Sequence, residues 1–213
     1  MMAITLAKGQ GLSLEKSQHN LSLVTIGLGW DIAEKKTGFL GGLFGSQSAE
    51  YDLDVVAFLC DADGKVRDLG WDGAGNATLR DSDVIFFNNL YHRSGNIRLT
   101  GDNRTGAGDG DDERILIDLQ AIDSNIAKIA FVVTIHNAQA KRQTFGMINN
   151  SYVRLIDLDQ NEKEICRFNL KENGSTATSV IFAELYRSGS EWQFKAVGEG
   201  KIADLNGVLA LYQ

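Results

Sequence analysis

A glycine-rich stretch, GDNRTGAGDGDDER at residues 101–114, concentrates acidic side chains between glycines. It contains five carboxylates, four glycines and only two arginines. Carboxylates this close repel one another in a folded chain unless a cation lies among them. Two explanations remain open, a solvated acidic loop and a metal-cation site. A phosphate-binding loop is excluded, because the stretch lacks the G-K-[ST] sequence and its acids would repel phosphate.

Calcium is the metal that fits this composition best. Ca²⁺ takes about six to eight oxygen ligands from carboxylates and backbone carbonyls in a flexible geometry, and glycines let carbonyls turn inward. Magnesium usually keeps several waters, and zinc and copper favour His or Cys ligands. We therefore predict a calcium site that includes this stretch.

A second acidic pair, Asp52 and Asp54 in YDLDVV, lies at the start of a predicted strand. Alternation places both side chains on one face, roughly 7 Å apart. Two acids facing the core would be unfavourable, but at the mouth of a strand they can meet acids from elsewhere and share a cation. Two other acidic stretches, residues 61–72 and 157–168, lack the glycine that an EF-hand needs at its sixth position, so we predict hairpin turns there.

The sequence gives little support for an enzyme. His19, His92 and His136 are far apart, no serine lies in a nucleophile elbow, and no cysteine has an evident activating partner. Acids crowded on a glycine-rich loop suit metal ligation better than the two-carboxylate chemistry of a glycosidase. We predict no catalytic activity.

The elements that must position these acids are strands, because the dominant hydrophobic period is two. Turn signals recur every 8–12 residues, with no proline in the chain and no linker composition. Eight to ten strands are expected, with a hairpin at Asp63-Gly64 followed by a second strand, and short helices in residues 119–127 and 202–212. The prediction is a single all-β domain over residues 1–213, a β-sandwich of two antiparallel sheets with long loops and one or two short helices.

Several features narrow the class of protein further. A net charge of −7 argues against a nucleic-acid partner. Cys60 and Cys166 lie in apolar runs and are expected to be buried free thiols. Trp30, Trp71 and Trp192 are expected in the core.

No signal peptide or membrane-spanning run is evident, which predicts a cytoplasmic protein. The apolar segment GFLGGLFG, residues 38–45, is expected to be a long loop, either folded on its own sandwich or used for docking.

Four segments together resemble one known family, the TerD family of bacterial tellurite-resistance and general stress proteins. They are GLGWD from Gly27, DLDVVAFLCDADGKV from Asp52, GDNRTGAGDGDDE from Gly101 and SEWQFKAVGEG from Ser190. The resemblance implies a two-sheet sandwich that binds calcium, with two ions expected at one end. Carried over by position, it implies the metal ligands Asp52, Asp54, Asp102, Asn103, Thr105, Gly108, Gly110, Asp111, Asp112 and Glu113.

The resemblance also implies a role in stress response and tellurite resistance. The partners expected from it are other Ter-family proteins and a membrane-embedded Ter protein. We therefore expect a calcium-dependent interaction module. The alternative is a sandwich whose bound calcium bridges anionic lipid headgroups while the 38–45 segment inserts, so that membrane contact is indirect or calcium-dependent.

Overall fold

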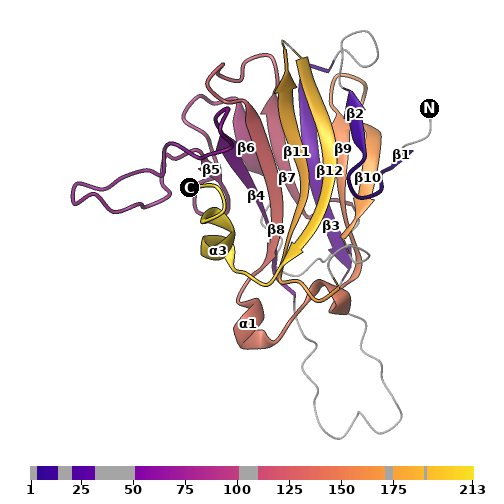
Figure 1. The fold of residues 1–213 in the computed structure, drawn as a ribbon. Helices are drawn as coiled ribbons and strands as arrows, with labels where there is room; N and C mark the ends of the chain where they lie inside the picture. Colours follow the sequence, from indigo (N-terminus) through magenta and orange to yellow (C-terminus); the bar gives the residue numbers. More distant parts are fainter. Residues whose placement is uncertain (1–3, 14–20, 32–50, 101–109, 171–174, 190) are drawn as a thin grey trace, which may run out of the picture.

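The structure, a computed structural model, describes residues 4–13, 21–31, 51–100, 110–170, 175–189 and 191–213. Two sheets of six strands each form the body of the described structure and stack face to face (Figure 1). The predicted all-β sandwich is therefore confirmed. The described residues hold twelve strands rather than eight to ten, because three short edge strands, β1, β2 and β6, lie outside the predicted strand segments.

The first sheet has the order β1-β10-β9-β3-β7-β6, with β3 near its centre. Its pairs are antiparallel except for β1, which runs parallel to β10. The strands are β1 (Ile4–Thr5), β3 (Leu23–Asp31), β6 (Ile97–Thr100), β7 (Glu113–Asp118), β9 (Asn149–Asp157) and β10 (Lys163–Asn169).

The second sheet has the order β2-β12-β11-β8-β4-β5, and all its pairs are antiparallel. It lies in front in Figure 1. The strands are β2 (Gly11–Ser13), β4 (Leu53–Cys60), β5 (Val84–Ile85), β8 (Lys128–Ile135), β11 (Ser179–Ser188) and β12 (Glu191–Lys201).

Strand β4 is buried on both faces, which explains its nearly unbroken apolar sequence. Leu53, Val55, Ala57 and Leu59 belong to the main core between the sheets, whereas Val56, Phe58 and Cys60 belong to a second apolar cluster on the outer face. Residues 203–213, which include α3 (Leu205–Leu209), cover that outer face. The Tyr212 ring stacks on Phe58 with centroids 4.8 Å apart.

The helices match the prediction in part. Helix α3 lies within the predicted 202–212 segment, whereas the predicted helix at 119–127 is wrong, because these residues form turns. The described residues also include α1 (Ala138–Lys141) and the 3₁₀ turn η1 (Phe145–Met147), both at the end of the sandwich where β3 finishes (Figure 1). The predicted strand after Asp63-Gly64 is also wrong, because residues 65–70 are not in a strand.

The cysteines match the prediction, and the tryptophans match it in part. Cys60 and Cys166 are buried free thiols, as predicted, and burial raises the pKa of each to about 12. Trp30 and Trp192 are buried, but Trp71 is 59% exposed, so its predicted core position is wrong. Trp71 bridges to Ala77 in a hairpin that projects from the side of the sandwich (Figure 1).

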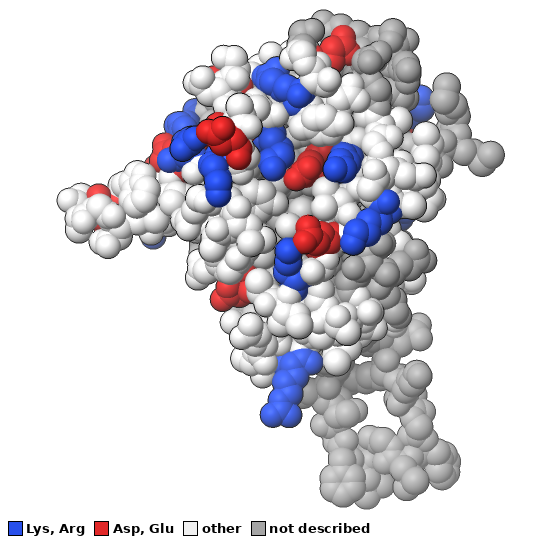
Figure 2. All heavy atoms as spheres, viewed as in Figure 1, with Lys and Arg blue, Asp and Glu red and all other residues white. Residues whose placement is uncertain are grey.

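The surface over the second sheet carries mixed charge despite the negative total. Figure 2 shows Lys and Arg side chains interspersed with Asp and Glu on this face. One such pair joins Lys128 of β8 to Glu184 of β11 at 3.5 Å. This face therefore offers no broad patch of one sign, and the candidate metal ligands must be sought at the ends of the strands.

Candidate functional site

The predicted ligands of β4 lie at the end of the sandwich where this strand begins. Asp54 is 6% exposed and sits on the outer face of the second sheet, by alternation with the inward-facing Leu53 and Val55. Its Oδ2 lies 3.8 Å from Nδ1 of His136, which follows β8. The His136 N–H donates to the carbonyl oxygen of Asp52 at 2.8 Å. Asp52, Asp54 and His136 therefore lie close together at this end.

Glu113 links the two sheets at the same end. It is the first residue of β7 in the first sheet, and the residue is 1% exposed. The N–H of Val55 in β4 donates to Glu113 Oε2 at 2.7 Å. Strand β5 pairs with β4 only at Ala57 and Phe58, so Glu113 supplies an acceptor on the stretch of β4 that β5 does not pair with.

Asp112 joins β7 to the end of β3. Its N–H donates to the Leu28 carbonyl at 2.8 Å, and its Oδ2 accepts from the Trp30 N–H at 3.0 Å. The Trp30 indole N–H in turn donates to the carbonyl of Tyr51 at 3.2 Å, directly before Asp52. This chain of contacts brings Asp112 and the β4 acids to one end of the molecule.

Asp111 has a different environment from its two neighbours. Its side chain is fully buried, and its oxygens accept from Arg154 Nε at 2.7 Å and from Arg114 Nε at 2.9 Å. These arginines also pair with Glu164 and Glu162 respectively, both at 3.0 Å. Burial alone would lower the pKa of Arg154, but hydrogen bonds to Asp111 and Glu164 outweigh it, and the pKa rises.

The structure thus describes six of the ten predicted ligand positions. It brings Asp52, Asp54, Asp112 and Glu113 to one end, while Asp111 and Gly110 turn over the outer face of the first sheet. Asp102, Asn103, Thr105 and Gly108 lie outside the described residues, as does the 38–45 segment. Within the described residues, no three His, Cys, Asp or Glu side chains form a group that could hold a metal. The acidic oxygens are of the kind that calcium takes, but these residues alone do not complete a calcium site.

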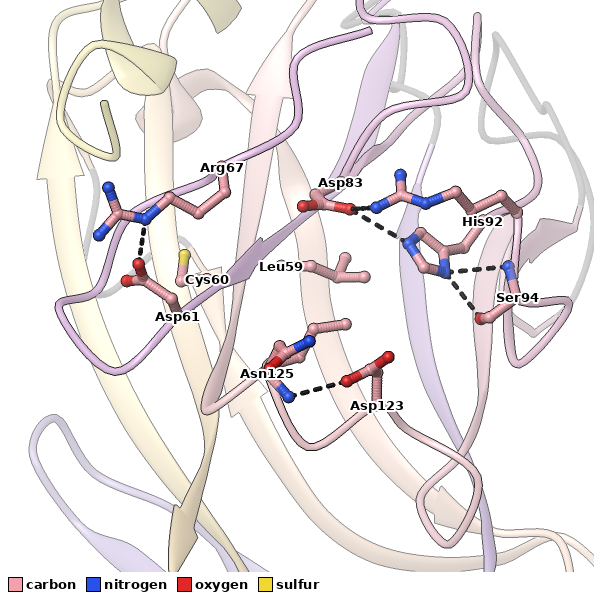
Figure 3. A pocket seen from close by; sticks show the side chains of 11 residues that line it. Leu59, Cys60, Asp61, Arg67, Asp83, His92, Ser94, Asp123 and Asn125 are labelled. Atoms are coloured by element: carbon pink, nitrogen blue, oxygen red, sulfur yellow. Dashed lines mark hydrogen bonds and ion pairs between the residues drawn. The ribbon is translucent and has the colours of Figure 1, made fainter.

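A pocket of about 360 Å³ lies near the opposite end of β4 (Figure 3). Asp83, His92 and Ser94 line it and form a chain of hydrogen bonds. His92 Nδ1 is 2.7 Å from Ser94 Oγ, and His92 Nε2 is 3.2 Å from Asp83 Oδ1. This grouping was not predicted from the sequence. The two-residue spacing of His92 and Ser94 before Gly95 is the sequence signal for it, because it is typical of a turn stabilised by side chains.

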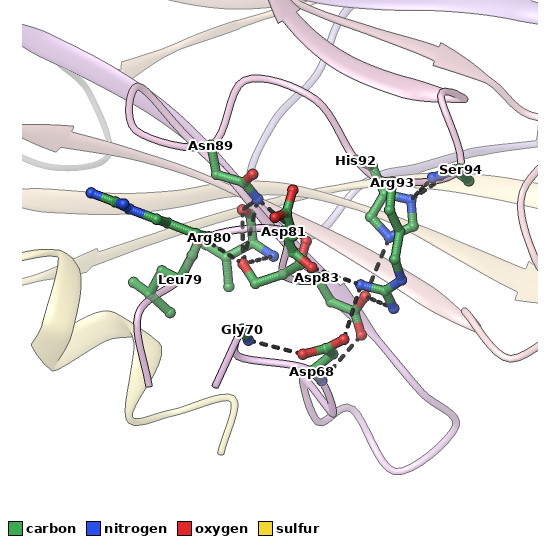
Figure 4. Close-up of polar contacts among 12 residues, drawn as sticks. Asp68, Gly70, Leu79, Arg80, Asp81, Asp83, Asn89, His92, Arg93 and Ser94 are labelled. Carbon is green, nitrogen blue, oxygen red and sulfur yellow. Dashed lines mark hydrogen bonds and ion pairs between the residues drawn. The ribbon is translucent and has the colours of Figure 1, made fainter. Parts of the chain in front are cut away.

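The neighbours of this grouping indicate that it holds loops together. Ser94 Oγ also accepts from the Asn96 N–H at 3.3 Å, within the same turn. Asp83 accepts from Arg93 Nη2 at 2.7 Å and from the Asp68 N–H at 3.2 Å (Figure 4). Arg93 also pairs with Asp68 at 3.1 Å. The carboxylate of Asp83 therefore ties residues 68 and 92–93 to the short strand β5.

The Asp83 contacts predict an acid-sensitive contribution to stability. Burial alone would raise the pKa of Asp83, but the hydrogen bond from His92 and the charge of Arg93 hold it below its ordinary value. A lowered folded-state pKa stabilises the fold above about pH 4, and this contribution is lost as pH falls through the lowered pKa. Asp83→Asn should therefore lower the free energy of unfolding by about 2 kcal/mol at neutral pH. This difference from wild type should shrink below pH 4.

Urea denaturation from pH 2 to pH 7 measures this difference. Asp81→Asn is the matched control, because Asp81 is exposed and only two residues away. A constant difference between wild type and Asp83→Asn across this range would contradict the assignment.

No helix among the described residues is both long and apolar enough to cross a membrane.

Comparisons with known proteins agree with the fold. The TerD domain model matches residues 2–212. Tellurium resistance protein TerX of Serratia marcescens is 51% identical over 205 residues, 95% of each chain. Stress response protein SCP2 of Bacillus subtilis (strain 168) is 42% identical over 199 residues, 93% of each chain. A crystal structure of a telluride resistance protein (TerD) homologue from Streptomyces coelicolor A3(2) has a TM-score of 0.64 and 22% identity, over 87% of this chain and 94% of that one. The chain belongs to the TerD domain family, whose members include tellurium-resistance and stress-response proteins.

Proposed function

We propose that this chain is a calcium-binding interaction module. Two Ca²⁺ ions would neutralise the acids at one end of the sandwich, and the surface ordered in this way would contact another Ter-family protein. The proposal places the protein in the cytoplasm, gives it no catalytic step and no nucleic-acid partner, and includes a membrane-embedded Ter protein as an indirect route to the membrane.

The observation that supports the proposal is that carboxylates distant in sequence lie at the same end of the sandwich. Asp54 lies in β4 of one sheet and Glu113 in β7 of the other, with Asp52 and Asp112 directly before these strands. The Glu113–Val55 hydrogen bond joins the two strands. Strand β6 ends at Thr100 and β7 begins at Glu113 beside it, so both ends of the 101–112 segment lie at this end. The segment that carries the remaining predicted acids therefore begins and ends at this end of the sandwich.

These residues would have separate tasks. Asp52, Asp54 and Asp112 would supply oxygens at the end of the strands, together with ligands from the 101–109 segment. Glu113 would keep β4 and β7 at a fixed separation through Val55. A bound calcium ion supplies the positive charge that offsets repulsion among the acids.

Calcium should stabilise the chelator-treated protein. At a free concentration one hundred times Kd, the ion adds about 2.7 kcal/mol to the free energy of unfolding. For a protein of this length that corresponds to a rise in melting temperature of about 5 to 10 °C. Asp54→Asn should weaken binding and reduce this rise, because one charged ligand oxygen set is lost. Isothermal titration with calcium and thermal melts measure the two quantities.

Asp123→Asn is the control, because Asp123 is an exposed acid that lines the pocket near the other end of β4. It should keep the calcium response of the wild type. The proposal fails if millimolar calcium produces neither heat nor a change in melting temperature. Co-sedimentation with anionic liposomes, with and without calcium, addresses the lipid alternative. Calcium-dependent pelleting would favour that alternative over the protein-interaction role.

A further inference from the structure

Asp111 is a carboxylate whose oxygens are both occupied by protein donors. Arg154 and Arg114 donate to Oδ1 and Oδ2, and the Asp111 side chain has no exposed surface. Strands β9 and β7 supply the two arginines, on either side of β3. The Tyr152 hydroxyl adds contacts to the same segment, 2.9 Å from the Gly110 carbonyl and 3.4 Å from Asp111 Oδ1.

The central strand provides space for this arrangement. A Cβ atom at Gly27 would lie within 2.7 Å of both Asp111 carboxylate oxygens. A Cβ at Gly29 would lie 2.8 Å from the Gly110 carbonyl oxygen and closer still to the Tyr152 ring. The two glycines of the GLGWD segment thus leave the outer face of β3 bare where Gly110 and Asp111 pack on it.

Holding Asp111 on the outer face directs the next two residues elsewhere. Asp112 immediately bonds to β3 through its backbone and side chain, and Glu113 points between the sheets to Val55. We propose that Asp111 is a positioning residue and not a calcium ligand. Its carboxylate, held by two arginines, fixes the start of β7 so that Asp112 and Glu113 reach the acidic end of the sandwich. The calcium part of this inference rests on the proposed function, whereas the anchoring part does not.

The two roles predict opposite results for the metal-free protein. If Asp111 were one of several crowded metal ligands, its neutralisation would relieve repulsion and leave the metal-free protein as stable or more stable. If Asp111 is the anchor, its neutralisation removes the buried carboxylate that the two guanidinium groups share, leaves each with only its outer glutamate, and destabilises the protein. The melting temperature in chelator therefore separates the roles without any added ion.

The experiment compares Asp111→Asn, Asp54→Asn and wild type in EDTA and in saturating calcium. Asp111→Asn should melt about 5 °C or more below wild type in EDTA. It should keep the wild-type calcium stoichiometry, with affinity weakened about tenfold because Asp112 and Glu113 are displaced. Asp54→Asn should instead keep its melting temperature in EDTA and show a reduced calcium response. An unchanged melting temperature of Asp111→Asn in EDTA, with loss of one bound ion, would overturn the proposal.

Arg114→Gln tests the same idea with a milder change, should Asp111→Asn not fold. Arg114 is 30% exposed, and its removal leaves Arg154 in place. For an anchor, calcium affinity should stay equal or fall, because the start of β7 loosens. For a ligand, affinity should rise, because calcium no longer competes with Arg114 for the carboxylate. If wild type binds no calcium, the proposed function fails, and the melting temperatures in EDTA still decide whether Asp111 is the anchor.

Discussion

Gly27→Ala should lower the free energy of unfolding by about 4 kcal/mol. The new methyl group would occupy the position of the Asp111 carboxylate, within 2.7 Å of both oxygens, in a site with no free space. Overpacking of this kind costs about 1 to 3 kcal/mol, and displacing the carboxylate also breaks its contacts with Arg154 and Arg114. Urea denaturation followed by tryptophan fluorescence measures the loss.

Gly11→Ala is the matched control for this change. Gly11 also lies in a strand, but a Cβ there would meet only the Phe194 carbonyl oxygen at 3.6 Å, an ordinary contact. Its effect should stay within about 1 kcal/mol, because the substitution mainly restricts the unfolded chain. Equal losses in the two variants would show that strand glycines are generally sensitive and that the Asp111 contact is not the reason.

Glu113→Ala should have a comparable effect, about 3 kcal/mol. The substitution leaves the buried Val55 N–H without its acceptor, which costs about 1 to 3 kcal/mol, and it opens a cavity beside β4. Thermal melts and urea denaturation in EDTA measure the loss in the absence of any ion.

Glu113→Gln separates the shape of this side chain from its charge. Glutamine keeps the volume and a carbonyl oxygen that can accept from Val55, so about 1 kcal/mol should be lost in EDTA. A loss as large as that of alanine would show that the charge, and not the hydrogen bond between the sheets, is what Glu113 contributes to the fold.

Much of the fold could be predicted from local pattern. Strands β3, β4, β8, β9 and β11 have long alternating or apolar runs, which need no distant partner to be recognised. The errors arose where distant contacts decide the conformation. Residues 65–70 lack a strand partner, because the Val66 N–H bonds to the Tyr212 carbonyl and the Asp68 N–H bonds to the Asp83 side chain.

The turns at 119–127 illustrate the same limit. An apolar spacing there suggested a helix, but the Asp118 carboxylate accepts from the N–H groups of Gln120 and Ala121 and closes a turn instead. An aspartate that bonds to nearby backbone competes with helix formation, and the pattern of apolar residues does not reveal which of the two is preferred.

The candidate site could be predicted from the sequence only in part. The composition of residues 101–114 indicated where acids collect, and the structure places Asp112 and Glu113 beside the start of β4. The composition could not indicate that the Asp111 side chain packs apart from those of Asp112 and Glu113, because the residue types of adjacent acids do not distinguish their environments. The residues that set Asp111 apart are those around it, namely Gly27, which has no side chain, and the arginines at 114 and 154. They become neighbours only through the pairing of β3 with β7 and β9.

The cover formed by residues 203–213 has a consequence for biosynthesis. Val56, Phe58 and Ala130 form an apolar surface on the second sheet that this segment shields. During translation the segment leaves the ribosome after β12, so the nascent strands expose that surface to solvent before residues 203–213 can cover it. Exposed apolar faces of this kind promote aggregation and chaperone capture. Variants that weaken the docking of Tyr212 should therefore reduce soluble yield more than their equilibrium stability alone would suggest.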